Sequence, residues 1–258
     1  MDVFSVPDLP EVREGDDLAA LVAERVDLRG EAGSGPPDVL VVASTVVSKA
    51  EGRVADLSEF PAGPRATEIA DRLGEIAGEE KDPRFAQAVL EESTEVVMEA
   101  PFLLTETKFG HVGVNAGIDR SNVPDHDMLL LPERPAESAT RIRERLPVDV
   151  PVVVTDTCGR PFRHGQQAVA LGWAGMPACR DWRGETDRDG HELSVTVQCV
   201  VDELASAANL VAGEGAGGTP VTVVRDWAFG DLGGMDEVFR DVDGDLVRQA
   251  LRGWEFEG

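Results

Sequence analysis

The stretch Pro151-Val152-Val153-Val154-Thr155-Asp156-Thr157-Cys158-Gly159-Arg160-Pro161 changes from an apolar run to a polar segment at Thr155. Its first four residues predict a buried strand, and the residues after them predict an acidic turn at the end of that strand. A second segment, Asn115-Ala116-Gly117-Ile118-Asp119-Arg120-Ser121-Asn122, follows the apolar runs 102–107 and 112–114 in the same way. Strands that end in polar turns therefore indicate the fold class and a candidate site together.

Asp119 and Asp156 each lie close in sequence to small hydroxyl residues and an arginine. Carboxylate and hydroxyl oxygens at strand ends can hold a hard divalent cation, which in turn bridges phosphate oxygens. The alternative is that each aspartate caps its own turn, as aspartate often does. A third polar turn, Ser48-Lys49-Ala50-Glu51-Gly52, makes a shared site the favoured interpretation.

The rest of the chain predicts strands in pairs with helices irregularly interleaved. We expect helices at 16–27, 66–77, 83–92, 137–146, 195–211 and 243–251, and strands at 39–47, 102–107, 111–114, 151–154 and 221–224. This order favours an α+β fold with mixed sheets over a strict βαβ repeat. Because we find neither an internal repeat nor a low-complexity linker, we expect residues 1–258 to form a single domain that could divide into two subdomains.

The charge of the chain is strongly acidic, with 49 Asp and Glu against 24 Lys and Arg, a formal net charge of −25. Such a surface repels nucleic acid and anionic membranes, so neither is expected as a partner. A salt-rich cytoplasm would screen the self-repulsion. We interpret the acidity as adaptation to high salt, because the acid is spread along the chain and not gathered in an interaction tail.

The three cysteines, Cys158, Cys179 and Cys199, lie far apart in sequence without a Cys-x-x-Cys pair. This spacing argues against a zinc ribbon or a disulfide framework. The segment after Met1 has no apolar run typical of a signal peptide, and no stretch approaches transmembrane length. We therefore expect a cytoplasmic, reduced protein.

Two further features point to a nucleotide. Lys49 is one of only three lysines and follows a predicted strand, where its charge could reach a phosphate; the alternative is a solvated lysine on a turn. A P-loop is excluded because its glycine–lysine spacing is missing. The segment Gly213 to Gly218 could approach a nucleotide closely or could simply cap the preceding helix.

Four motifs resemble one family in their order and spacing: Ser48 to Arg53, Asn115 to Asn122, Thr155 to Pro161, and Arg183-Gly184-Glu185 with Asp187. It is the coenzyme F420 gamma-glutamyl ligase family, whose members use GTP to add L-glutamate to the side chain of a deazaflavin coenzyme. The resemblance runs from Leu9 to the strand after Pro220 and so covers most of the chain. Agreement of several separate motifs makes it far more specific than a lone glycine fingerprint.

The resemblance implies an α+β fold that forms an intertwined homodimer. It also implies a reaction: GTP phosphorylates the terminal carboxylate of the glutamate-free coenzyme precursor, and the amine of L-glutamate attacks the resulting acyl phosphate to form a gamma-linkage. The chain ends soon after the ligase region, so the nitroreductase-like extension of some relatives is not expected. The same amide-ligase chemistry on a folate-like or peptide acceptor, and a non-catalytic nucleotide-sensing module, remain open as alternatives.

Site residues carried over from the family by position form three groups. Asp119 and Asp156 would bind a first divalent cation, Mg²⁺ or Mn²⁺, and Thr157 and Glu214 a second, with K⁺ as a further candidate ion. Glu214 departs from the family pattern, which leads us to expect glutamine there. Residues expected to contact GTP are Leu9, Pro10, Glu11, Val12, Ser44, Thr45, Lys49, Asn122, Ala212, Gly213, Gly215, Ala216, Gly217, Gly218 and Thr219. Arg120, Arg160 and Arg163 are candidates for acidic substrate groups on charge alone.

Overall fold

The computed structural model describes residues 1–30, 35–121, 123–215, 217–254 and 256. The chain divides into two compact units. Unit 1 comprises Met1–Ala50 and Arg134–Val238, and unit 2 comprises Glu51–Glu133 and Phe239–Gly258.

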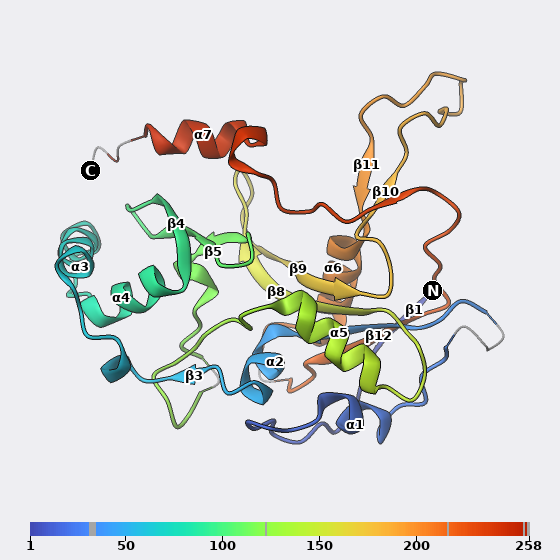
Figure 1. Ribbon diagram of the computed structural model, residues 1–258, viewed down its shortest axis with the longest axis horizontal. Coiled ribbons are helices and arrows are strands. Elements are labelled where there is room, and N and C mark those ends of the chain that lie inside the picture. Colours follow the sequence, from blue (N-terminus) through green and yellow to red (C-terminus); the bar gives the residue numbers. More distant parts are fainter. Residues whose placement is uncertain (31–34, 122, 216, 255, 257–258) are drawn as a thin grey trace. The chain divides into compact units, whose positions relative to one another are not determined.

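Unit 1 is built on a five-stranded sheet with the order β1-β12-β2-β8-β9 (Figure 1). Only the central pair, β2 and β8, is parallel; the other neighbours are antiparallel. Parallel strands need a long crossover connection, and the chain between β2 and β8 begins with α2 and includes all of Glu51–Glu133. The strands are β1 (Asp2–Ser5), β2 (Val39–Ala43), β8 (Val152–Gly159), β9 (Gln166–Ala174) and β12 (Val221–Arg225).

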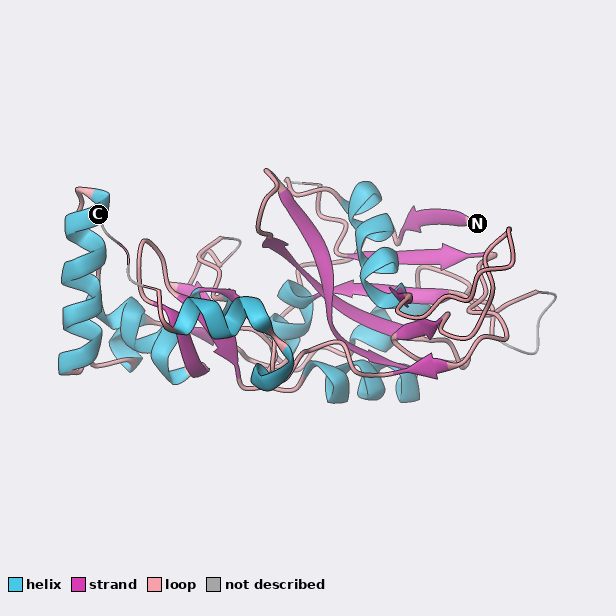
Figure 2. Cartoon of the chain, turned by 90° about the horizontal axis from the view of Figure 1, so that it is seen from above, coloured by secondary structure: helices cyan, strands magenta, loops and turns pink. Residues whose placement is uncertain are grey.

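Helices cover both faces of this sheet (Figures 1 and 2). Leu40, Val42 and Val152 lie in one core cluster with residues of α1, α2 and α5, whereas Val41 and Val153 lie in another with residues of α6. This alternation follows from side chains pointing to opposite faces along a strand. The helices are α1 (Leu18–Ala23), α2 (Ser44–Ala50), α5 (Pro135–Arg145) and α6 (Val200–Ala212).

A small three-stranded sheet lies at the base of an extended arm in unit 1. Its order is β11-β10-β13, with β10 (Cys179–Asp181), β11 (Val197–Cys199) and β13 (Gly234–Met235). Between β10 and β11 the chain runs out and back (Figure 1), joined by the bridge Thr186–Glu192. The arm therefore begins and ends at the strands that carry Cys179 and Cys199.

Among its described residues, unit 2 combines three α-helices with two small antiparallel sheets. Its core contains Ile69 of α3, Val89 of α4, Leu103 and Met128, all buried. The sheets pair β4 (Ser93–Met98) with β5 (Leu104–Thr107) and β6 (Val112–Val114), and β3 (Val54–Ala55) with β7 (Met128–Leu129). The helical elements are α3 (Pro64–Ala77), α4 (Pro83–Glu91), α7 (Leu246–Arg252), η1 (Leu57–Glu59), η2 (Asn115–Gly117) and η3 (Val242–Gly244).

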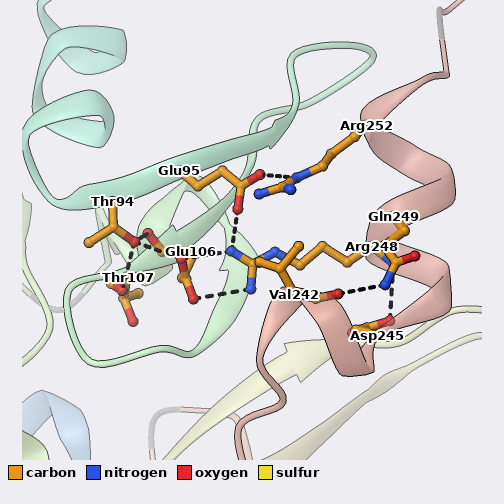
Figure 3. A network of polar contacts seen from close by, with 9 residues as sticks. All are labelled: Thr94, Glu95, Glu106, Thr107, Val242, Asp245, Arg248, Gln249 and Arg252. Carbon is orange, nitrogen blue, oxygen red and sulfur yellow. Dashed lines mark hydrogen bonds and ion pairs between the residues drawn. The ribbon is translucent and has the colours of Figure 1, made fainter.

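The last helix is attached to unit 2 through buried charge. Arg248 of α7 is 3% exposed and its guanidinium contacts Glu106 of β5 twice, at 3.1 and 2.7 Å. The same group also bonds Glu95 of β4, and Arg252 bonds the other oxygen of Glu95 at 2.6 Å (Figure 3). Guanidinium–carboxylate pairs of this kind are directional, so they fix the orientation of α7 as well as its position.

The expected α+β fold with mixed sheets is confirmed, and most expected elements are present within a few residues. Three predictions were wrong. The turn expected after Val154 is part of β8, which continues to Gly159. The strand expected to reach Val47 ends at Ala43, so the turn expected at Ser48 is the last turn of α2. The helix expected from Val195 begins only at Val200.

Among the described residues, no helix is both long enough and apolar enough to cross a membrane. The single domain, the homodimer and the reduced cytoplasmic setting stay predictions.

Candidate active site

Two consecutive residues of β8, Asp156 and Thr157, direct their side chains to opposite faces of the unit 1 sheet. Asp156 lies on the α2 face, where Ser44 Oγ donates a hydrogen bond to its Oδ1 at 3.1 Å. Thr157 lies on the α6 face, where its Oγ1 donates to Glu214 Oε2 at 3.4 Å. A register shift against β9 occurs just before these residues. Such bulges re-aim side chains and are frequent beside active sites.

Ser44 reaches Asp156 because β2 and β8 are parallel. In their register Ala43 is opposite Thr155, so the first residue beyond β2 lies next to the residue after Thr155. Ser44 is 3% exposed, and its hydrogen bond is therefore shielded from water. The contact limits the orientations that the Asp156 carboxylate can adopt. Thr45, the other residue expected here to contact GTP, is only partly buried.

Glu214 is held from two directions. Besides Thr157, the side chain of Asn209 donates from Nδ2 to Glu214 Oε1 at 2.7 Å. Asn209 lies in the last turn of α6, and the chain turns at Gly213, whose φ of 71° places it in the left-handed region. Nothing in the sequence singled out Asn209, because an asparagine near a helix end usually serves only as a cap.

The loop after α6 is closed by one side chain. Thr219 Oγ1 donates to the carbonyl oxygen of Ala212 at 3.0 Å, which brings the two ends of the segment together. A Cβ added at Gly215 would meet no atom within 4 Å, so the backbone there is open to a close approach. Ala216 lies outside the described residues; nucleotide binding by the remaining residues, including Gly217 and Gly218, stays a prediction.

Lys49 and Glu11, both expected to contact GTP, are brought together. Lys49 Nζ lies 2.5 Å from Glu11 Oε1, with the lysine side chain 13% exposed and the glutamate 67% exposed. Lys49 is therefore not a solvated lysine on a turn, which was the alternative interpretation of this residue. Leu9 and Val12 pack into the core beside this pair, so only Pro10 and Glu11 of that segment present side chains to solvent.

Asp119, in unit 2, caps its own turn. Its Oδ1 accepts the backbone N–H of Ser121 at 2.8 Å and its Oδ2 accepts the Ser121 hydroxyl at 2.6 Å. This is the capping interpretation left open above, and it does not apply to Asp156, which lies inside a strand. Arg120 packs over the ring of Phe85, with Cζ 5.9 Å from the centroid. Asn122 lies outside the described residues.

Two of the candidate substrate arginines, Arg160 and Arg163, lie at the tip of the β8–β9 hairpin. Arg160 donates to the carbonyl oxygen of Gly165 at 3.2 Å, so its guanidinium braces the turn. Arg163 is exposed, and between them Phe162 is 99% exposed with φ 66°. A bulky residue in the left-handed region is uncommon and marks local strain.

The neighbouring thiol is a weak nucleophile at neutral pH. Burial, followed by the negative charges of Asp156 and Asp202, raises the pKa of the Cys158 thiol. A raised pKa keeps the sulfur protonated, and a neutral thiol attacks poorly. Covalent catalysis through Cys158 is therefore disfavoured.

The structure brings Asp156, Thr157 and Glu214 into one unit, while Asp119 belongs to the other. Sharing of one cation by Asp119 and Asp156 thus stays a prediction. In the part of the chain that is described, no three His, Cys, Asp or Glu side chains form a group suited to a metal ion. Any divalent cation here would therefore need hydroxyl or ligand oxygens as well, and phosphate oxygens are a common source.

Comparison with known proteins gives a consistent result. The sequence model of a family described as F420-0:Gamma-glutamyl ligase matches residues 8–226. A protein from Halorubrum lacusprofundi named "Coenzyme F420:L-glutamate ligase" is 73% identical over 257 residues, covering 100% of both chains. Proteins of the same name from Halobacterium salinarum and Archaeoglobus fulgidus are 69% and 48% identical, covering 100% and 98% of both chains, respectively.

Proposed function

The chain belongs to the F420-0:gamma-glutamyl ligase family, and on that premise we propose that it adds L-glutamate to the glutamate-free precursor of coenzyme F420 in a GTP-dependent reaction. Membership confirms the resemblance stated from the sequence motifs. Two of the similar proteins come from halophilic archaea, in agreement with the salt-adapted source expected from the net charge of −25.

The proposed reaction has two steps. The γ-phosphoryl group of GTP moves to the terminal carboxylate of the acceptor, giving an acyl phosphate and GDP. The amine of L-glutamate then attacks the acyl carbon, the C–O bond to phosphate breaks, and an amide and inorganic phosphate result. The protein's part in such a sequence is mainly positioning and charge stabilisation, which can supply about 7–11 kcal/mol of the barrier.

The observation that carries the proposal is the pair of oxygen-bearing contacts at consecutive positions of β8. Asp156 with Ser44 and Thr157 with Glu214 lie on opposite faces of one sheet. Their oxygens are the ligand type that Mg²⁺ and Mn²⁺ prefer. When bound, such cations neutralise charge on transferring phosphoryl groups. Placement of Asp156 and Thr157 on different faces supports their assignment to two different ions.

The ion ligands are proposed as Asp119 and Asp156 for the first cation and Thr157 with Glu214 for the second, with K⁺ as a further ion. Asn209 would keep Glu214 oriented through its 2.7 Å hydrogen bond. In the proposed nucleotide site Lys49 exchanges its contact with Glu11 for a phosphate oxygen, because both partners would offer the lysine a negative charge at hydrogen-bond distance.

Acidic groups of the two substrates are proposed to meet the hairpin tip. Arg163 is exposed, and Arg160 lies next to it with one nitrogen on Gly165. Both are planar donors suited to carboxylates and phosphates. Arg120 is the third candidate, from unit 2. A homodimer is proposed on the strength of the family resemblance alone.

The test is ligation itself, followed by mass spectrometry of the acceptor. The wild-type protein in molar KCl is mixed with the precursor, L-glutamate, GTP and either Mg²⁺ or Mn²⁺, and each component is omitted in turn. The matched variants are Asp156→Asn and Glu24→Gln. Each removes one carboxylate, but Glu24 is a surface residue with a 71% exposed side chain paired to Arg25.

We expect a glutamylated product only in the complete mixture, from the wild type and Glu24→Gln, and at least a hundredfold less from Asp156→Asn (a loss of about 2.7 kcal/mol in transition-state stabilisation). Product formed equally well with ATP would overturn GTP dependence. Product formed from a folate or peptide acceptor, but not from the precursor, would overturn the substrate.

A further inference from the structure

Two of the three free cysteines face each other across the base of the arm in unit 1. In the antiparallel pair β10–β11, Cys179 is directly opposite Cys199. Cys179 is 4% exposed and Cys199 is half-buried. The proposed ligase reaction uses neither residue, and nothing in the sequence pattern pairs them, since nineteen residues separate them in the chain.

Whether the two sulfurs can be joined depends on whether Cys179 and Cys199 form a hydrogen-bonded or a non-hydrogen-bonded pair of the antiparallel ladder. Val200 N donates to Ala178 O at 2.9 Å and Trp182 N donates to Thr196 O at 3.1 Å. Hydrogen-bonded and non-hydrogen-bonded pairs alternate along antiparallel strands, so the Cys179–Cys199 pair is of the non-hydrogen-bonded kind.

Non-hydrogen-bonded pairs have Cα atoms about 4.5 Å apart, with side chains closer than in the other kind. Disulfides span Cα separations of about 4.4–6.8 Å, so this position admits one without movement of the strands. The Cys199 side chain also opposes the rise that burial causes in the pKa of Cys179, as expected for two thiols at directly opposite positions of paired strands.

We propose that Cys179 and Cys199 are a modification site, at which a peroxide oxidises the two thiols to a reversible intrachain disulfide. The more exposed sulfur, Cys199, attacks hydrogen peroxide as a thiolate, taking one oxygen as a sulfenic acid while the other leaves as hydroxide. Cys179 then displaces the sulfenic hydroxyl and the S–S bond forms. Two electrons pass from the sulfurs to the peroxide, and the two thiol protons end in two molecules of water.

The disulfide would tie the base of the arm to α6. Cys199 immediately precedes Val200, the first residue of α6, and the far end of that helix carries Asn209, the partner of Glu214. The arm itself, residues 182–196, holds Arg183, one of the residues that carry the family resemblance. Oxidation would therefore stabilise the arm and α6 together, by closing a loop that the unfolded chain must otherwise order.

Burial and the surrounding negative charges determine how fast the two thiols are oxidised. Burial, followed by the negative charge of Asp202, raises the pKa of the Cys199 thiol, so little thiolate is present at neutral pH. Burial, with smaller contributions from Asp202, Asp236 and Glu237, likewise raises the pKa of the Cys179 thiol. Oxidation should thus accelerate about tenfold per pH unit between about pH 7 and about pH 9, the range in which thiolate remains the minor form.

The experiment treats the reduced full-length protein with hydrogen peroxide in molar KCl, alkylates the remaining thiols after denaturation, and maps tryptic peptides by mass spectrometry. Cleavage after Arg163, Arg180 and Arg188 places the three cysteines on separate peptides, 146–163, 164–180 and 189–225. The variants are Cys179→Ser, Cys199→Ser and, as the matched control, Cys158→Ser. Circular dichroism of the untreated variants checks that each is folded.

We expect peptides 164–180 and 189–225 to be joined, Cys158 to be alkylated, and dithiothreitol to separate the joined peptides. Cys158→Ser should keep the link and each of the other variants should lose it. Oxidised wild type should melt at a higher temperature than reduced wild type, and oxidised Cys179→Ser should not. Absence of the joined peptides at every pH, a link through Cys158, or a link between two chains would overturn the proposal.

Discussion

Replacement of Arg248 by methionine tests how the C-terminal helix is held. The guanidinium is 3% exposed and bonds Glu95 and Glu106, whose side chains are only 21% and 22% exposed (Figure 3). Methionine fills a similar length of side chain but leaves both carboxylates without this partner. Breaking a buried ion pair by removing one member costs about 3–5 kcal/mol, because the remaining charge is desolvated and unpaired.

The lower end of that range applies here. Glu95 keeps its 2.6 Å contact with Arg252, and Glu106 keeps its 2.8 Å contact with the Thr94 hydroxyl. We therefore expect Arg248→Met to lower the free energy of unfolding by about 3 kcal/mol. Arg252→Met is the matched control: its side chain is 49% exposed, so its loss should cost about 0–1 kcal/mol.

The loss of stability caused by Arg248→Met should become smaller as the pH falls. The hydrogen bond from Arg252, and after it that from Arg248, lowers the pKa of Glu95, and the bond from Arg248 lowers that of Glu106. A carboxyl group whose pKa is lower folded than unfolded contributes stability above its unfolded pKa, about 4.5, and loses it as the pH falls through the folded value. The difference between wild type and Arg248→Met should therefore shrink below about pH 4.5.

The assay is urea unfolding in molar KCl, with hydrogen exchange at the amides of α7 as the local readout. High salt is suitable because buried pairs are screened much less than exposed ones. Equal stabilities of Arg248→Met and Arg252→Met at neutral pH would refute the reasoning, as would a difference that grows on acidification.

Four further predictions concern the candidate site and the surface. Asp119→Asn and Asp156→Asn should each abolish ligation at saturating Mg²⁺ or Mn²⁺ while circular dichroism remains unchanged; near-normal turnover in either would remove that residue from the ion sites. Lys49→Ala should weaken GTP binding in calorimetry by about tenfold or more, the effect of losing one charge-assisted hydrogen bond; unchanged affinity would leave Lys49 with only its partner Glu11. Asn209→Ala should raise the divalent-cation concentration needed for half-maximal activity about tenfold with little change in KM for GTP, since it releases Glu214; an unchanged cation requirement would limit Asn209 to capping. The melting temperature should rise steeply from low salt towards molar KCl, as the screening length falls from about 30 Å to about 3 Å, and an uncharged osmolyte should not reproduce the rise; a flat profile would reopen the search for a cationic partner.

The sequence pattern predicted the fold class well because most elements are decided locally. The helix at α4 begins where Asp82 precedes Pro83, and the aspartate does cap the backbone N–H of Arg84. The β5–β6 hairpin joins the strands expected at 102–107 and 111–114 through a turn at Gly110, whose φ of 95° suits glycine. In both cases the residues that define the ends are neighbours in the chain.

The predictions failed where distant pairing decides the structure. Thr155 to Gly159 reads as a turn, but β9 pairs with every residue of this segment, and that ladder extends β8 by five residues. Val46 and Val47 favour a strand by propensity, yet they lie in α2, where both are buried in the same core cluster as Leu40 and Val42. Single-sequence patterns contain neither fact.

The sequence predicted those residues of the candidate site that fall at motif positions. Asp156, Thr157 and Glu214 were chosen from motif positions, and the structure adds their supporting contacts. Asn209 was missed because its role arises from the turn of the chain at Gly213, which brings Glu214 back to it; in the sequence, Asn209 is an ordinary helix residue four positions before that glycine. The Cys179–Cys199 pair was likewise hidden, since only the strand register shows it.

The most direct test of the account uses a precursor whose terminal carboxylate carries ¹⁸O. With L-glutamate, GTP and Mg²⁺ or Mn²⁺, the acyl phosphate route transfers one carboxylate oxygen to the phosphate that leaves when the amine attacks. We predict a glutamylated product that has lost one ¹⁸O and inorganic phosphate that has gained it, in equal amounts. Label found in water or in a guanine nucleotide instead of in inorganic phosphate, or no product at all, would contradict the central claim.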